Sequence, residues 1–204
     1  MHHFEIDKFQ DLPFQHVQFS KIFTDKYALN LLKWLEQSVT WKLKITDFYQ
    51  QFECNLSSCP VPQGIQFFRE KVFLEVLKHT IEELFHTKVG TNINISATKM
   101  VKGQFVEIHN DYLSNESSHR LVIYLNEGWK EKQGGDLVIF NSYNRRDIHE
   151  IVSPNHNTGF AFKISGKSLH EVKAITSGQR FSLVYTFYEK VKQSNKQVRP
   201  SKSG

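Results

Sequence analysis

The chain has 204 residues, enough for one large domain or two small ones, and a hydrophobic fraction of 39% indicates a globular protein. The formal net charge of +5 arises in the segment 190–204, which holds five basic residues and no acid, so the rest of the chain is neutral. This distribution argues against a nucleic-acid-binding protein, which would spread basic residues over a folded face. No apolar run is long enough to span a membrane.

Targeting and redox signals are few. The chain starts with polar residues and no apolar signal segment follows, so we expect a cytoplasmic protein in which Cys54 and Cys59 are reduced. The composition of the segment 190–204 predicts a basic, disordered tail. Residues 1–189 are then expected to form a single domain, because no linker or repeat divides them.

Residues 1–90 are expected to be mainly helical and to support the rest of the domain. Thr24 can cap a helix that runs over about 24–39, where leucines recur on one face. A second, longer helix is predicted over about 65–85 from the same helical spacing. Between the two helices, the segment 41–55 is rich in β-forming residues and is expected to be extended.

From residue 91 the pattern changes to short extended runs separated by turns. The predicted strands are 92–101, 105–109, 120–126, 136–140, 149–153, 159–164, 169–172 and 180–188. Eight such strands predict a mainly β domain with supporting α-helices. Its core over about 91–189 would be a jelly roll, with the N-terminal helices packed on one sheet.

His109 and Asp111 are the first candidate metal ligands. A His-x-Asp pair alone is weak evidence, since about one is expected by chance in a chain of this composition, and His3 and Glu5 form another. His109, however, closes a predicted strand, and residues two apart in an extended chain point to the same side. Both side chains can therefore reach one metal ion.

A third ligand must come from elsewhere in the sandwich. His149, His156 and His170 all lie downstream in the β region, and only His170 is followed ten residues later by an arginine, Arg180. Two imidazoles and one carboxylate can hold Fe(II) on one face and leave the opposite face open for substrates and dioxygen. The spacing therefore favours His170.

Arg180 opens an apolar strand and shares its face with Ser182. An arginine on the inner face of such a strand is costly to bury without a partner, and a ligand carboxylate held in bidentate fashion would satisfy it. Ser182 could add a hydroxyl donor to the same group. The alternative is a surface-facing arginine on an edge strand.

These residues carry a resemblance. The runs His109-Asn110-Asp111 and Arg180-Phe181-Ser182, with His170, resemble the motif of Fe(II)/2-oxoglutarate-dependent oxygenases. The runs 119–126 and 134–137 are similar to the prolyl-4-hydroxylase-like branch of that superfamily. The resemblance implies a double-stranded β-helix, a variant of the jelly roll, that uses Fe(II), 2-oxoglutarate and dioxygen.

The same resemblance implies roles for individual residues. His109, Asp111 and His170 would be the metal ligands, and Tyr124 would help Arg180 and Ser182 to bind the distal carboxylate of 2-oxoglutarate. The presence of Asp111 favours hydroxylation over halogenation, since related halogenases have a small residue at this position.

Two further residues are candidates for contact with a substrate. Arg120 shares the phase of Tyr124 and can face the mouth of the pocket, to meet an acidic substrate group or a cosubstrate carboxylate, or it can lie in solvent. Asn110 also lies near the expected opening. Trp41, Tyr49 and Trp129 are either an aromatic mouth or part of the core.

Several short runs resemble a small bacterial group that hydroxylates ribosomally made peptides containing cyclophane rings. These runs are Trp34-Leu35-Glu36-Gln37, Asp47-Phe48-Tyr49-Gln50, Asn126-Glu127-Gly128-Trp129 and His156-Asn157-Thr158-Gly159. The resemblance implies hydroxylation of an unactivated C–H bond of a peptide. A free amino acid or other small metabolite, a prolyl residue of a protein and a non-catalytic jelly-roll ligand-binding module are the alternatives.

Overall fold

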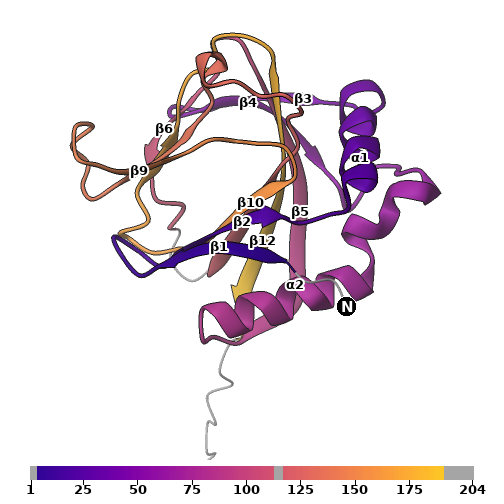
Figure 1. The fold of residues 1–204 in the computed structure, drawn as a ribbon, viewed down its shortest axis with the longest axis horizontal. Helices are drawn as coiled ribbons and strands as arrows, with labels where there is room; N and C mark the ends of the chain where they lie inside the picture. The colour runs from indigo at the N-terminus through magenta and orange to yellow at the C-terminus, as the bar shows by residue number, and fades with distance from the viewer. Residues whose placement is uncertain (1–3, 113–116, 191–204) are drawn as a thin grey trace, which may run out of the picture.

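The computed structural model describes residues 4–112 and 117–190, which form two antiparallel sheets with helices on one side (Figure 1). The eight-stranded sheet has the order β1-β2-β10-β7-β12-β5-β4-β3. Its strands are β1 (Glu5–Gln10), β2 (His16–Lys21), β3 (Lys42–Ile45), β4 (Gln50–Asn55), β5 (Val89–Val101), β7 (His119–Tyr124), β10 (Thr158–Lys163) and β12 (Gln179–Glu189). The four-stranded sheet has the order β6-β11-β8-β9, with β6 (Val106–His109), β8 (Leu137–Phe140), β9 (Ile148–Val152) and β11 (His170–Val172).

The predicted fold class is confirmed. All eight strands expected after residue 91 are present, each within three residues of its predicted ends. Turn residues between short extended runs explain this accuracy. In β7, buried and half-buried side chains alternate from His119 to Ile123. The two sheets enclose a cavity between their inner faces, and the site described below lies in that cavity.

Helices cover the outer face of the large sheet. Helix α1 (Asp25–Gln37) and helix α2 (Lys71–Leu84) bury apolar side chains against β7 and β12 (Figure 1). Leu35 and Phe73 belong to the same buried cluster as Ile123 and Leu183. The predicted supporting helices are therefore present, and their packing fixes β7 and β12 from the face of the sheet opposite the cavity.

The helical prediction was wrong in two places. Residues 5–21 form β1 and β2, which extend the large sheet through pairing of β2 with β10, because Val17 and Phe19 alternate with polar residues and enter the core. The predicted helix 65–85 is split into a 3-10 helix η1 (Gln63–Arg69) and α2. Glu70 between them is extended, with φ −68° and ψ 144°.

The remaining expectations concern single features of the chain. Thr24 stands at the N-cap of α1, but its side chain makes no capping hydrogen bond. Both cysteines are free. Residues 191–204, where most of the predicted tail lies, are outside the described residues. No helix within 4–112 and 117–190 has the length and apolar character needed to cross a bilayer.

Two buried asparagines join distant segments. Asn157 has φ 62°, and its side-chain amide donates to Phe23 O (2.8 Å) while its oxygen accepts from Phe23 N (2.9 Å). Asn126 accepts from Phe181 N (2.6 Å) and donates to Pro154 O (2.8 Å). Each amide satisfies backbone groups that would otherwise be buried without partners.

We expect Asn157→Ala to lower the free energy of unfolding by about 2–3 kcal/mol, because it removes two buried hydrogen bonds at a left-handed residue. Urea denaturation followed by fluorescence measures this loss. Asn155→Ala is the matched control, since Asn155 is an exposed asparagine of the same loop. Equal stability of the two variants would contradict a structural role for the Asn157 amide.

His119 should make the protein less stable in acid. Its ring is fully buried against Phe85, and burial, with a smaller effect of Lys163, lowers its pKa to about 4. Between the ordinary pKa of 6.5 and about 4, the unfolded chain binds more protons than the folded one, so stability falls as the pH falls. We expect His119→Leu to remove about 3 kcal/mol of this acid-induced loss, measured by urea denaturation between pH 7.5 and 4.5. An unchanged pH dependence in the variant would contradict it.

Candidate active site

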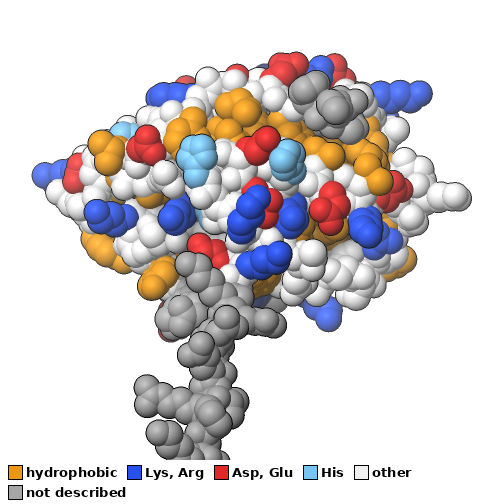
Figure 2. Space-filling model, turned by 90° about the horizontal axis from the view of Figure 1, so that it is seen from below, with side chains coloured by type: hydrophobic (Ala, Val, Ile, Leu, Met, Phe, Trp, Pro, Cys, Tyr) orange, Lys and Arg blue, Asp and Glu red, His pale blue; other side chains and the backbone are white. Residues whose placement is uncertain are grey.

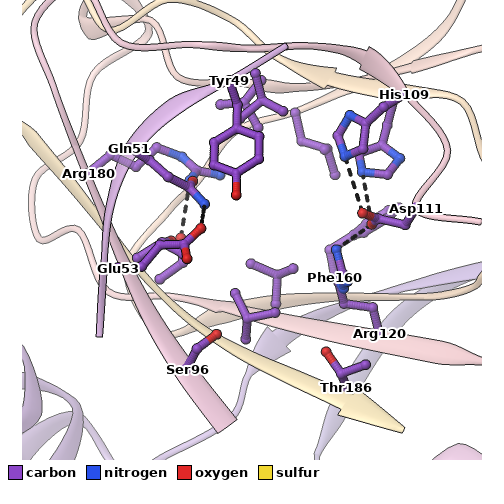
Figure 3. Close-up of a pocket in the computed structure, with 18 of the residues that line it drawn as sticks. Tyr49, Gln51, Glu53, Ser96, His109, Asp111, Arg120, Phe160, Arg180 and Thr186 are labelled. Carbon is purple, nitrogen blue, oxygen red and sulfur yellow. Dashed lines mark hydrogen bonds and ion pairs between the residues drawn. The ribbon is translucent and has the colours of Figure 1, made fainter. Parts of the chain in front are cut away.

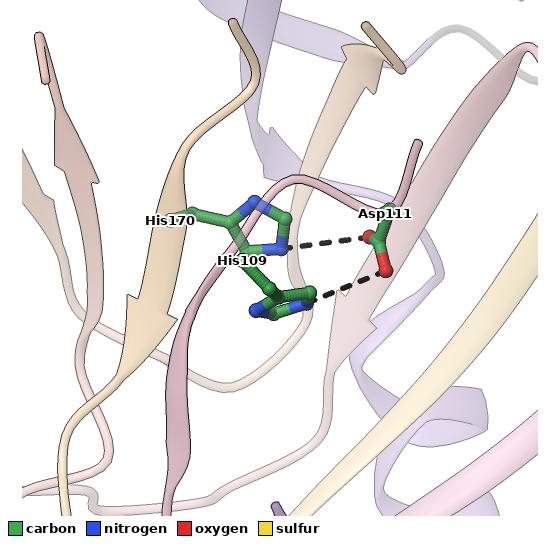
Figure 4. Close-up of side chains that lie close together, drawn as sticks. All are labelled: His109, Asp111 and His170. Atoms are coloured by element: carbon green, nitrogen blue, oxygen red, sulfur yellow. Dashed lines mark ion pairs between the residues drawn. The ribbon is translucent and has the colours of Figure 1, made fainter. Parts of the chain in front are cut away.

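Three side chains meet at the open end of the small sheet. His109 ends β6 and His170 begins β11, and the two residues are direct partners in the antiparallel pairing of these strands. Asp111 follows with φ 58°, a left-handed turn that aims its carboxylate back at both rings. His109 Nε2 lies 3.3 Å from Asp111 Oδ1, and His170 Nε2 lies 3.5 Å from Asp111 Oδ2 (Figure 4).

Both imidazoles are held in the same orientation by the backbone. His109 Nδ1 lies 2.9 Å from Glu107 O, and His170 Nδ1 lies 2.7 Å from Ser168 O. A carbonyl oxygen can only accept, so each Nδ1 carries the proton and each Nε2 keeps its lone pair. The two free nitrogens and a carboxylate oxygen lie within 4.8 Å of one another, which is the arrangement of a three-ligand metal site.

His170 and Asp111 are in the protonation states that a metal requires. Burial, followed by the neighbouring His109, lowers the pKa of His170 to about 4. Burial alone would raise the pKa of Asp111, but the effects that lower it, of which the positive charge of Arg120 is the largest, outweigh burial and hold this pKa below its ordinary value. At neutral pH the site therefore offers a neutral His170 and an ionised carboxylate, a donor set that fits Fe(II).

A cavity of about 410 Å³ extends from these side chains between the sheets (Figure 3). Arg180 stands at its inner end and is only 4% exposed. Its Nη1 lies 3.2 Å from Ser182 Oγ, its guanidinium lies 5.1 Å from the centre of the Tyr124 ring, and its Nε has no hydrogen-bond partner. β12 lies between β7 and β5, so the alternative of a surface arginine on an edge strand is wrong.

Arg180 is a buried cation that forms no ion pair with any carboxylate of the described residues. Burial lowers its pKa, although the guanidinium remains charged at neutral pH. A buried charge without an ion-pair partner costs free energy of folding, and an anionic ligand in the cavity would reduce this cost. The apolar side chains of Leu137, Phe160 and Phe162 line the same cavity and limit its access to water.

The sequence of the core matches a known family. A model of the 2OG-Fe(II) oxygenase superfamily matches residues 95–188, which contain all three candidate metal ligands and Arg180. Residues 95–188 belong to the 2OG-Fe(II) oxygenase superfamily. The oxygenase accordingly uses Fe(II), 2-oxoglutarate and dioxygen, and the donor set and the buried cation fit the first two.

Solved structures share the fold. A prolyl-4-hydroxylase from Pseudomonas putida superposes with a TM-score of 0.71 at 18% identity, covering 86% of this chain and 92% of that one. A Trichoplax adhaerens prolyl hydroxylase, solved with a hypoxia inducible factor peptide fragment, has a TM-score of 0.65 at 12% identity and coverages of 85% and 83%. A viral collagen prolyl hydroxylase from Paramecium Bursaria Chlorella virus-1 superposes with a TM-score of 0.60 at 13% identity, covering 86% of this chain and 96% of that one. The comparison with curated proteins found no match.

The structure also places the other candidate residues of the oxygenase. Arg120, on β7, brings Nη1 to 2.5 Å from Asp111 Oδ2 (Figure 3), a partner that the sequence analysis did not foresee. Asn110 lies beside the opening, but its amide oxygen accepts from Tyr112 N (3.0 Å) and its amide nitrogen lies 3.4 Å from Gly166 O. Asn110 therefore shapes the loop that carries Asp111.

One wall of the cavity was missed by sequence analysis. The β3–β4 hairpin contributes Lys44, Tyr49, Gln51 and Glu53, of which only Tyr49 had been considered (Figure 3). The alternation of Gln51 and Glu53 with Phe52 was the available signal, although it could not show which face was inward. The two tryptophans considered with Tyr49 do not line this cavity. Trp41 packs against the helix-side core, and Trp129 donates from Nε1 to Gly134 O.

We expect Fe(II) to stabilise the oxygenase by about 2.7 kcal/mol at a concentration 100 times its dissociation constant. His170→Ala should lose most of this gain, because one of three donors is removed, whereas His149→Ala should keep it. Denaturation without oxygen, with and without Fe(II), measures the difference. A full metal-dependent gain in His170→Ala would exclude His170 as a ligand.

Proposed function

We propose that His109, Asp111 and His170 hold Fe(II), and that Arg180, Ser182 and Tyr124 bind the distal carboxylate of 2-oxoglutarate. The supporting observation is their placement in one cavity. Three metal donors stand at one end and a buried guanidinium without an ion-pair partner stands at the other. A dicarboxylic acid between them would reach the iron with one carboxylate and satisfy Arg180 with the other.

When bound, iron would couple two reactions, the reduction of dioxygen and the decarboxylation of 2-oxoglutarate, to the oxidation of a C–H bond. The residues of the chain supply position and electrostatics. Ser182 and Arg180 fix one end of the cosubstrate, while the backbone-held imidazoles fix the other end through the metal. Phe160 and Phe162 keep the surrounding volume apolar, which strengthens the charge interactions inside it.

We propose a hydroxylase whose substrate is a peptide, most specifically a ribosomally made peptide. The volume and openness of the site support this choice, since a second cavity of about 340 Å³ adjoins the first at the metal-facing residues and gives room for more than one side chain. Two of the solved structures with this fold are named for a peptide ligand or for collagen. A free amino acid or other small metabolite is the alternative substrate.

Succinate release tests the proposal. Purified protein with Fe(II), 2-oxoglutarate and oxygen should convert 2-oxoglutarate to succinate, faster when a peptide substrate is added, and a peptide product should gain one oxygen atom by mass spectrometry. His109→Ala and Asp111→Ala should abolish both while the fold persists. Metal and 2-oxoglutarate binding without any turnover would instead indicate a ligand-binding module.

Arg180→Gln should raise the dissociation constant of 2-oxoglutarate by about 100-fold or more, because loss of a buried ion-pair partner costs about 3–5 kcal/mol. Calorimetry with Zn(II) in place of Fe(II) measures this constant without turnover. Arg146→Gln is the matched control, since Arg146 is exposed. Unchanged 2-oxoglutarate affinity in Arg180→Gln would remove Arg180 from this role.

A further inference from the structure

A second cavity adjoins the metal-facing residues on their outer side. Its volume is about 340 Å³, and it shares Phe48, His109, Asp111, Arg120 and Thr186 with the main cavity. A group bound in this outer cavity would therefore lie beside the proposed iron site without displacing 2-oxoglutarate from Arg180. Arg120 is the cation between the two cavities, and nothing in the proposed function uses it.

Arg120 has donor capacity that its known contact does not use. Asp111 Oδ2 lies 2.5 Å from Nη1, but Nε has no hydrogen-bond partner, and a guanidinium carries five N–H donors. About a quarter of the side chain (26%) stays exposed. Asp111 is also the sole carboxylate among the described residues that line the outer cavity, and it faces the proposed metal.

Hydroxyl donors stand beside Arg120 on the neighbouring strand. Thr186 on β12 is its direct partner in the pairing with β7 and also lines the outer cavity (Figure 3). Tyr188 follows on the same face and lines it too. The Tyr188 hydroxyl accepts from Asn94 Nδ2 (2.6 Å), which leaves its own proton free to be donated. An arginine with two hydroxyls is a donor set for a carboxylate.

The charge balance favours an anion at this place. Lys44 and Glu53 neutralise each other on the opposite wall, with 3.4 Å between Nζ and Oε2. Bound Fe(II) and the 2-oxoglutarate dianion would cancel as well. Among the described residues that line the cavity, the two arginines then outweigh Asp111 by one positive charge. Figure 2 shows acidic and basic side chains intermixed on one face of the molecule.

We propose that Arg120, Thr186 and Tyr188 form a carboxylate-binding subsite, and that the substrate carries a carboxylate close to the C–H bond that is oxidised. This inference rests on the proposed function, since it places the subsite next to the iron. The carboxylate can come from an acidic side chain of a peptide or from a chain terminus, and both present the same group to the guanidinium.

Pairs of small probes test the proposal on the full chain loaded with Zn(II) and 2-oxoglutarate. N-acetyl-aspartate methylamide and N-acetyl-asparagine methylamide differ in the side-chain carboxylate. N-acetylglycine and its amide differ in the terminal one. Ligand-observed NMR gives the four dissociation constants. We expect at least one acid to bind about tenfold more tightly than its amide, and the pair that shows the preference identifies the source of the carboxylate.

Variants assign the preference to the subsite. Arg120→Gln should bring the acid and amide constants within about twofold of each other, and Arg120→Lys should restore part of the difference. Arg146→Gln is the matched control, since Arg146 is an exposed arginine that lines neither cavity and its loss should leave the preference intact. Equal binding of acid and amide by the unaltered protein, a preference that persists in Arg120→Gln, or no binding of either acid would overturn the proposal.

Measurements on the same samples distinguish failure of the carboxylate subsite from failure of the proposed function. Zinc content and 2-oxoglutarate affinity are measured on every variant, which also shows that Arg120→Gln is folded and keeps Asp111 in place. Failure of 2-oxoglutarate to bind the unaltered protein would overturn the proposed function. Normal, Arg180-dependent binding of 2-oxoglutarate without a preference for acids would overturn the carboxylate subsite alone.

Discussion

The site depends on the register between β6 and β11. His109 and His170 are opposite each other in this short antiparallel pairing, and that single match brings two imidazoles from distant parts of the chain to one point. A slip of one residue would turn one ring to the opposite face of the sheet and leave Asp111 with one neighbour. The pairing of β11 with β8 on its other side resists such a slip, because it buries β8 completely.

The second constraint is the attachment of the large sheet to its helices. Arg180, Ser182 and Tyr124 project inward from β12 and β7, while the opposite faces of these strands are buried under α1 and α2. Asn126 adds a local constraint, because its amide oxygen accepts a hydrogen bond from the backbone N–H of Phe181, the residue after Arg180. The aromatic ring and the guanidinium at the inner end of the cavity are therefore positioned together.

Much of this arrangement could be predicted from the sequence, and the reasons are physical. Short extended runs separated by turn residues located the eight downstream strands, and the spacing from His170 to Arg180 selected one histidine from three candidates. The hairpin of β1 and β2 was missed because its alternation is short, and Glu70 interrupts a helical pattern without any proline or glycine to mark the break. The wall from β3 and β4 was missed because periodicity separates the two faces of a strand without showing which is inward. The partnership of Arg120 with Asp111 depends on the tertiary fold alone.

The large sheet ends on one side at β3, where no further strand of residues 4–112 or 117–190 pairs with the outer backbone N–H and C=O groups. A second copy of the chain could pair with such an edge, and the exposed apolar side chains of Leu43 and Ile45 would add hydrophobic contact. Lys42 and Lys44 alternate with them, so an approaching copy would have to bury lysine side chains at the contact. Replacing both lysines with neutral residues is expected to increase self-association along this edge.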